Sequence, residues 1–164
     1  MELAYPVVIA QYKRDDYGVG KEEHFHWALI IVQDKQTLGG YVIQAVDRAV
    51  QGHGPTWHID CRAVDSLSRS SKCLGGVQVG SIKHGAFHSF VQAVHQHGVG
   101  SSSRPGWRCK DYVLELLEML RTYGSMHVQH LRVEVFLPAL REASRRTYAQ
   151  SVAAGRCVPH VTWL

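Results

Sequence analysis

The segment HFHWALIIV, residues 24–32, is among the most apolar stretches of this chain, and it contains two histidines at its start. A continuous apolar run of this length is typical of a β-strand that is covered on both faces. His24 and His26 alternate with Phe25 and Trp27, so both imidazoles would lie on the same face of the strand. A histidine inside such a run must find a polar partner or lower the stability of the fold. His26 is therefore either a core residue bonded to a backbone carbonyl or a participant in chemistry.

Five segments in the first half of the chain have the composition of strands. They are β-branched, aromatic or alternating segments, namely LAYPVVIAQY (3–12), FHWALIIVQ (25–33), GYVIQAVD (40–47), TWHIDCRAV (56–64) and LGGVQVGSI (74–82). The turn-rich sequence DKQTLGG joins the second segment to the third, as expected for a hairpin. These features predict a mainly antiparallel sheet of about five strands.

The second half of the chain has the apolar spacing of helices. We expect helices at residues 85–98, 109–124 and 138–155, the last with Pro138 in its first turn. The helix at 109–124 has the clearest pattern, because its apolar residues fall on one face and a glycine ends it. Strands followed by helices predict an α+β fold in which the helices pack against the sheet.

The charge and the termini limit the class of protein. The formal net charge is +4 over 164 residues, and apart from a cluster at Arg141, Arg145 and Arg146 the basic residues are scattered. No Lys/Arg run and no glycine-aromatic RNA motif occurs, so nucleic-acid binding is not expected. The N-terminus lacks a basic, apolar leader, and no apolar stretch has the roughly 18 residues that a membrane span needs. We expect a soluble cytoplasmic protein without a membrane span.

Cys109 differs from the other three cysteines, Cys61, Cys73 and Cys157. None of the four forms a CxxC pair, so a zinc knuckle is not expected and free thiols are. Cys109 follows a Ser/Gly/Pro loop and begins the clearest helix. A helix N-terminus carries about half a positive charge and unpaired N–H groups, which stabilise a thiolate and can hold an oxyanion. Cys109 is therefore either a reactive thiol or a small buried apolar residue.

A cysteine nucleophile needs a base, and the chain offers 11 histidines. Most of them have simpler explanations. Several belong to or flank the helix at 85–98 or lie in connecting segments, namely His53, His84, His88, His95, His97, His127 and His130. His26, inside an apolar strand, remains the strongest candidate for the base.

The order of these features resembles the circularly permuted papain-like superfamily that includes lecithin:retinol acyltransferase and its phospholipase/acyltransferase relatives. The resemblance lies in residues 25–47 and 107–120, where a His-Trp-Ala strand and its hairpin partner precede a cysteine that begins a helix. The chain also resembles a set of uncharacterised fungal proteins built on the same plan. The resemblance implies a single permuted papain-like domain over residues 1–164, with the base before the nucleophile in the chain.

The resemblance also implies roles for three residues. His26 takes the place of the base, and Cys109 takes that of the nucleophile. Gln44 falls on the neighbouring strand where relatives often have histidine, and its amide oxygen can accept from one imidazole nitrogen and so orient the ring. The relatives have an Asn-Cys-Glu-His helix start and a hydrophobic anchoring tail, whereas this chain has Arg-Cys-Lys-Asp and lacks that tail. The resemblance therefore supports cysteine chemistry more than it supports a lipid substrate.

Three aromatic residues are candidates for the substrate and oxyanion site. Tyr12 ends the first strand and either gives its hydroxyl to the oxyanion or is a half-buried strand residue. Trp107 either walls the pocket or packs as a staple at the start of the helix. Trp27 is the third candidate, from the motif that carries the resemblance. The segments 15–23 and 98–106 are expected to border the cleft.

These observations favour a thiol hydrolase or acyltransferase that acts on an amide, ester or thioester through a covalent acyl-enzyme. The substrate would be a small molecule or a peptide with an acyl bond, and the chemistry needs neither a metal nor an organic cofactor. Two alternatives stay open. One is a non-catalytic binding domain of the same fold, and the other is a peptidase or isopeptidase.

Overall fold

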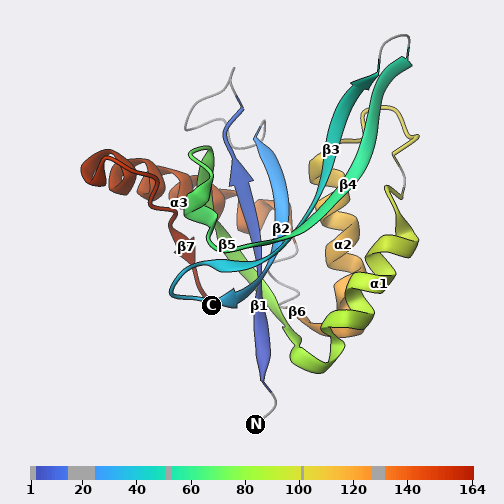
Figure 1. Ribbon diagram of the computed structural model, residues 1–164, viewed down its shortest axis with the longest axis horizontal. Helices are drawn as coiled ribbons and strands as arrows, with labels where there is room; N and C mark the ends of the chain where they lie inside the picture. The colour runs from blue at the N-terminus through green and yellow to red at the C-terminus, as the bar shows by residue number, and fades with distance from the viewer. Residues whose placement is uncertain (1–2, 15–24, 51–52, 101, 127–131) are drawn as a thin grey trace.

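A computed structural model describes residues 3–14, 25–50, 53–100, 102–126 and 132–164 (Figure 1). Within these residues the chain has an α+β fold with seven strands and three α-helices. The strands are β1 (Ala4–Tyr12), β2 (His26–Asp34), β3 (Gly39–Val50), β4 (His53–Val64), β5 (Cys73–Lys83), β6 (Gly124–Met126) and β7 (Val161–Thr162). The helices are α1 (Phe87–His97), α2 (Cys109–Tyr123) and α3 (Val133–Ala154), with short 3₁₀ turns η2 (Leu67–Arg69) and η3 (His84–Ala86).

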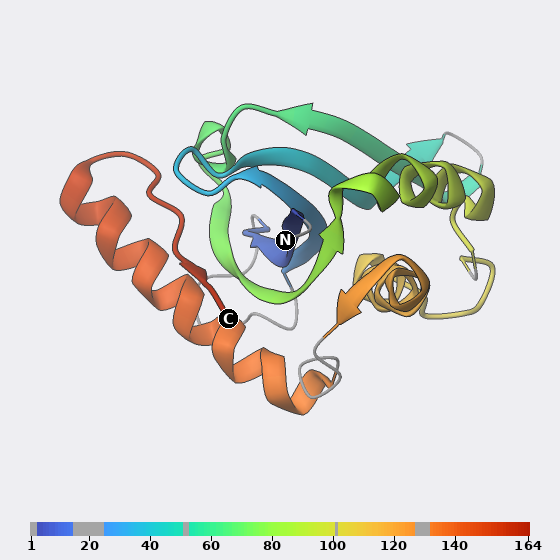
Figure 2. The same cartoon turned by 90° about the horizontal axis from the view of Figure 1, so that it is seen from below.

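The strands form one curled sheet in the order β4-β3-β2-β1-β5-β6, with β7 beside β5 (Figure 2). β7 pairs parallel with β5, and the other pairs are antiparallel. The sheet of the described residues is therefore mixed and seven-stranded, which corrects the prediction of a mainly antiparallel sheet of about five strands. The two additional strands, β6 and β7, are three and two residues long. Such short segments show no alternation that a sequence pattern can reveal.

β2 is buried on both faces, as its continuous apolar sequence indicates. Trp27, Leu29 and Ile31 lie in one apolar cluster, to which α1, α2 and α3 also contribute buried residues. Ala28 and Ile30 lie in a second cluster on the opposite face of the sheet. Because β2 is covered on both sides, the position of its first residue is fixed by the packing of the whole strand.

The start of α2 is stabilised by a carboxylate in its first turn. The backbone N–H of Arg108 donates to Oδ2 of Asp111 over 2.8 Å, which satisfies one group at the helix N-terminus. Val113 and Leu116 are buried in the cluster around Trp27. This apolar face holds α2 against the sheet and fixes where the first residue of the helix lies. Among the described residues, no helix combines the length and the apolarity that crossing a membrane requires.

α3 begins at Val133, so Pro138 lies inside the helix. The sequence had predicted that Pro138 lies in the first turn, and this prediction is wrong. A proline at this position removes the backbone bond to the carbonyl of residue 134. Phe136, Leu140 and Ala143 of α3 are all buried. Burial of these residues on both sides of the proline explains why the helix continues through it.

A glycine allows the C-terminal segment to approach β5. Gly75 has a φ of +80°, and a Cβ at this position would collide with the carbonyl oxygen of His160. The next residue, Gly76, donates its N–H to that same carbonyl over 3.0 Å. β7 follows directly, so its pairing with β5 depends on the close approach that Gly75 permits.

We predict that Gly75→Ala lowers the free energy of unfolding by about 2 kcal/mol or more, because it combines a left-handed φ with a backbone collision. Urea denaturation measures this loss. Gly85→Ala is the matched control, because nothing lies within 4 Å of the added Cβ and its φ is ordinary. The control should change the unfolding free energy by less than about 1 kcal/mol. Equal stability of the two variants would contradict the proposed role of Gly75.

Candidate active site

Three neighbouring strands bring His26 and Gln44 together. His26 is the first residue of β2, and Tyr12 at the end of β1 is its antiparallel partner. Gln44 lies on β3, which pairs with the other edge of β2. Nε2 of His26 lies 2.7 Å from Oε1 of Gln44, and only 8% of Gln44 is exposed. Gln44 is therefore a buried partner of the imidazole and not a solvent-facing strand residue.

Asp60 determines which way the Gln44 amide points. Asp60 is the cross-strand partner of Gln44 on β4, and its Oδ2 accepts a hydrogen bond from Nε2 of Gln44 over 2.8 Å. Because a carboxylate accepts, the amide NH₂ must face Asp60 and the amide oxygen must face His26. The imidazole Nε2 then carries a proton and donates it to that oxygen. Nδ1 is left to face the thiol, which is the arrangement a general base requires.

Sequence reasoning missed Asp60, although a signal was present. The segment TWHIDCRAV alternates, which places Asp60 and Arg62 on one face of its strand. The pairing register that sets Asp60 opposite Gln44 is needed to identify it. Nε of Arg62 in turn lies 3.7 Å from Oδ2 of Asp60. The two charges extend the polar chain from His26 to the rim of the site.

Cys109 is the first residue of α2 and only 2% exposed. Its sulfur forms hydrogen bonds with the imidazole of His26 and the backbone N–H of Trp27. The guanidinium of Arg14, just after β1, donates to the sulfur over 3.7 Å. Arg14 was also missed by sequence reasoning, because 95 residues separate it from Cys109. A thiol surrounded by these donors is stabilised as its anion.

The surroundings shift both members of the pair toward their charged forms. Burial favours the neutral thiol, but the hydrogen bond and charge of His26, the Trp27 N–H and Arg14 together lower the pKa of Cys109. Burial likewise favours a neutral imidazole at His26. The hydrogen bond and charge of Cys109, with the bond to Gln44, outweigh it and raise the pKa of His26. Opposite shifts of this kind describe a thiolate–imidazolium pair.

The other three cysteines have the opposite shift. Burial, and then the neighbouring Asp60, raise the pKa of Cys61 to about 11. Burial raises the pKa of Cys73 to about 12 and also raises that of Cys157. Because all four cysteines lie in the described residues, Cys109 can be compared with each of them directly. The lowered pKa of Cys109 favours a thiolate, whereas the raised pKa values of the other three favour neutral thiols.

The three aromatic candidates occupy different places. The ring centroid of Tyr12 lies 6.1 Å from that of His26, and burial, followed by the nearby Cys73, raises the pKa of Tyr12 above its ordinary value. Its hydroxyl therefore stays protonated beside the site. The ring of Trp27 is fully buried and packs at 5.7 Å against Phe136, while its backbone N–H donates to the Cys109 sulfur. Trp107, 5% exposed, packs edge-on against Trp57 at 5.3 Å.

Two cavities flank the His26–Cys109 pair. The larger, of about 600 Å³, is lined by Tyr12, His26 and Gln44. The smaller, of about 330 Å³, is lined by Cys109 and by Gly106 from the preceding loop. Arg14 lines both cavities. A ligand that bridges the two cavities would lie beside both the sulfur and the imidazole.

Some predicted features lie outside the described residues. These are the segment 15–23, which was expected to border the cleft, and His24, His127 and His130. Across the described parts of the chain, no three or more His, Cys, Asp or Glu side chains are grouped so that they could hold a metal ion.

The chain matches, over residues 6–157, a family of unknown function, DUF6914. It belongs to this family. No curated protein and no solved structure matches the chain. The segment that matches DUF6914 contains Cys109, His26, Gln44 and Asp60, so the whole candidate site lies inside it.

We predict that Cys109 reacts with iodoacetamide faster than the other three cysteines at pH 7, by at least about tenfold. Its rate should rise with pH through the lowered thiol pKa, and the ion pair should persist up to the raised pKa of His26. In His26→Ala, burial dominates, and the rate at pH 7 should fall. Peptide mapping by mass spectrometry follows each cysteine separately. If Cys109 in His26→Ala is alkylated as fast as in the wild type, the two residues do not form a pair.

Proposed function

We propose that the protein is a cysteine-dependent acyl hydrolase or acyltransferase with a permuted papain-like site. Cys109 is the nucleophile, His26 is the acid–base catalyst and Gln44 orients the imidazole. The observation that carries the proposal is the position of His26, whose ring is hydrogen-bonded between an amide oxygen and a thiol at a helix N-terminus. The chain order also supports it, since the base on β2 precedes the nucleophile on α2.

Acylation begins with attack of the Cys109 thiolate on the carbonyl carbon of an amide, ester or thioester. A C–S bond forms, and the carbonyl electron pair moves to oxygen. The N–H groups in the first turn of α2 and the hydroxyl of Tyr12 are the candidate donors to this oxyanion. The carbonyl then re-forms, and the bond to the leaving group breaks as the His26 imidazolium gives that group its proton. The products are the free leaving group and an acyl-enzyme with neutral His26.

Deacylation reverses the roles of the same residues. Neutral His26 takes a proton from water or from another acceptor as its oxygen, nitrogen or sulfur attacks the thioester carbonyl. The C–S bond breaks, and Cys109 leaves as a thiolate beside the re-formed imidazolium. Water gives hydrolysis, and any other acceptor gives acyl transfer. We place this chemistry in the cytoplasm, because the four cysteines are unpaired and a reducing compartment preserves thiols.

We predict that the wild-type protein accumulates an acyl adduct on Cys109 when it is incubated with activated esters, thioesters or amides. Intact-protein mass spectrometry detects the added mass, and peptide mapping locates it. Cys109→Ala should be folded and form no adduct. His26→Ala should lower the acylation rate by about 10²-fold or more, as expected for loss of a general acid–base group. Retention of full turnover by Cys109→Ala would overturn the proposal.

The same experiment separates the alternatives. Adducts from peptide amides alone would indicate a peptidase or isopeptidase. A protein that binds these compounds without forming an adduct would be a binding domain of the same fold.

A separate prediction concerns the amide that holds His26. Gln44→Ala should lower kcat but leave residual activity, because water can partly replace the amide, and Gln44→Leu should be as low or lower. Gln44→His should be tolerated, because an imidazole can also connect Asp60 to His26. Asp60→Asn keeps an acceptor for the Gln44 amide, whereas Asp60→Ala removes it. We expect Asp60→Ala to shift the pH dependence of Cys109 alkylation more than Asp60→Asn does. Equal profiles for the two variants would show that Asp60 does not hold the amide.

A further inference from the structure

α3 carries most of the exposed apolar side chains in the described part of the chain. Five large apolar residues are exposed there, and three of them belong to α3, namely Val135, Tyr148 and Val152, at 43%, 60% and 65% exposure. Figure 2 shows α3, in orange and red, along the outside of the curled sheet. Exposed apolar side chains that gather on one element are typical of an interaction surface.

The exposed residues of α3 follow a regular spacing. Alternating steps of three and four residues keep side chains on one face of a helix, as in coiled coils. Six exposed residues have this spacing and are here called the outer stripe; they are Val135, Pro138, Glu142, Arg145, Ala149 and Val152. Phe136, on the other side of the helix, is buried and packs against Trp27. The outer stripe therefore points away from the core.

The outer stripe is complementary to a second copy of itself. Two such helices that run antiparallel, with a two-fold axis between residues 143 and 144, place Val135 opposite the partner's Val152. The same alignment places Pro138 opposite the partner's Ala149. It also places Glu142 opposite the partner's Arg145. Because the axis repeats every contact, the apolar residues meet at both ends of the stripe and opposite charges meet twice at its centre.

The ion pairs within α3 permit this arrangement. Nε of Arg146 lies 3.0 Å from Oε1 of Glu142, whereas Nη1 of Arg145 lies 3.9 Å from Oε2 of the same carboxylate. The longer contact contributes little, because 64% of the Arg145 side chain is exposed to water. Arg145 can therefore turn to the partner's Glu142 while Arg146 stays on its own Glu142. All three charges then keep an opposite neighbour.

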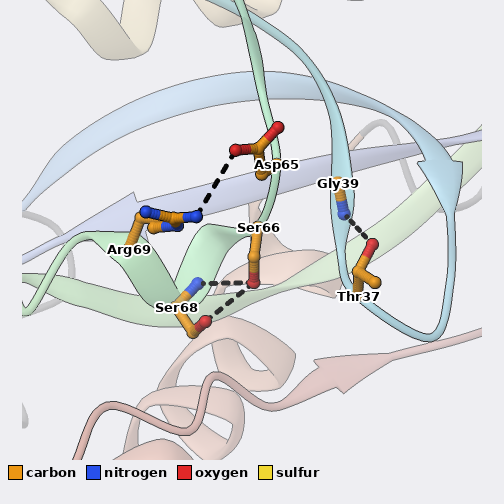
Figure 3. Close-up of polar contacts among 6 residues, drawn as sticks. All are labelled: Thr37, Gly39, Asp65, Ser66, Ser68 and Arg69. Atoms are coloured by element: carbon orange, nitrogen blue, oxygen red, sulfur yellow. Dashed lines mark hydrogen bonds and ion pairs between the residues drawn. The ribbon is translucent and has the colours of Figure 1, made fainter.

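Exposed ion pairs elsewhere lack the apolar residues of the outer stripe. Arg69 of η2 lies 3.5 Å from Asp65, in a turn built by hydrogen-bonded serines (Figure 3). On α2, Nη1 of Arg121 lies 3.1 Å from Oε1 of Glu118, with the same residue types and spacing as Glu142 and Arg145. Neither η2 nor α2 carries any of the five exposed large apolar side chains of the described residues. The combination is specific to α3 among these elements.

We propose that the outer stripe joins two copies of this chain as an antiparallel, two-fold symmetric pair of α3 helices. The contact from Val135 to Val152 extends over about 26 Å. Such an interface is smaller than those of permanent dimers, so we expect a reversible dimer with a dissociation constant of about 10–100 μM. The described linings of the two cavities contain no residue of α3, so the dimer leaves both cavities open. This inference is independent of the proposed cysteine chemistry.

Sedimentation velocity from about 2 to 500 μM brackets this range and should show the wild-type protein changing from monomer to dimer. Glu142→Lys gives two positive residues at the centre of the stripe, and Arg145→Glu gives two negative ones. Like charges then face each other, so each variant alone should dimerise at least about tenfold more weakly than the wild type. An equimolar mixture restores both opposite-charge contacts and should form a heterodimer about as tightly as the wild type.

Glu118→Lys and Arg121→Glu are the matched controls, because they change the equivalent exposed pair on α2. Each should dimerise like the wild type, alone or mixed, and urea denaturation checks that all four variants are folded. A wild-type protein that stays monomeric at about 500 μM overturns the inference and leaves the outer stripe to a different partner. Undiminished dimerisation of Glu142→Lys or Arg145→Glu, or a mixture of the two that stays monomeric, overturns the antiparallel contact.

Discussion

The burial of β2 on both faces is the constraint on which the site depends. Trp27 and Leu29 are locked into the core beneath the helices, and Ala28 and Ile30 are locked into the opposite core. A strand held in this way cannot slip by one residue, because a slip would exchange its two faces. The first residue, His26, therefore has a fixed position and direction. The backbone N–H of Trp27 is fixed with it, which is why one end of one strand supplies two groups to the Cys109 sulfur.

Burial disfavours a charge on Cys109 or on His26 alone, but the two charges together offset this effect. Each charge alone would be disfavoured, and burial is the largest single influence on both Cys109 and His26. The two charges offset this effect only when both are present and hydrogen-bonded, as is general for buried ion pairs. Gln44 is well suited to this site, because it orients the imidazole without adding a charge that would compete with the thiolate. Asp60 does not contact His26 but accepts a hydrogen bond from the Gln44 amide and so fixes its orientation, and Asp60 itself forms an ion pair with Arg62.

The sequence predicts the parts of the fold that have a periodic pattern. β1 to β5 and the start of α2 at Cys109 agree closely with the observed bounds, because apolar alternation and a glycine-rich loop mark them. β7 and the early start of α3 could not be predicted in this way. β7 is two residues held by the close approach at Gly75, and α3 continues through Pro138 because residues on both sides of the proline are buried. Both depend on contacts between distant parts of the chain.

The residues of the candidate site likewise divide into those that a local sequence pattern reveals and those that only the tertiary structure reveals. His26 and Cys109 stand out locally, one as a histidine in an apolar strand and the other as a cysteine at a helix start. Asp60 and Arg14 have no such local signal, since their importance comes from the pairing register of β3 with β4 and from the point where β1 ends. These two residues set what the visible pair can do. Asp60 acts through Gln44 on the tautomer of His26, and Arg14 donates a hydrogen bond to the Cys109 sulfur. The sheet thus couples the orientation of the His26 imidazole to the position of Arg14, because neighbouring strands supply both.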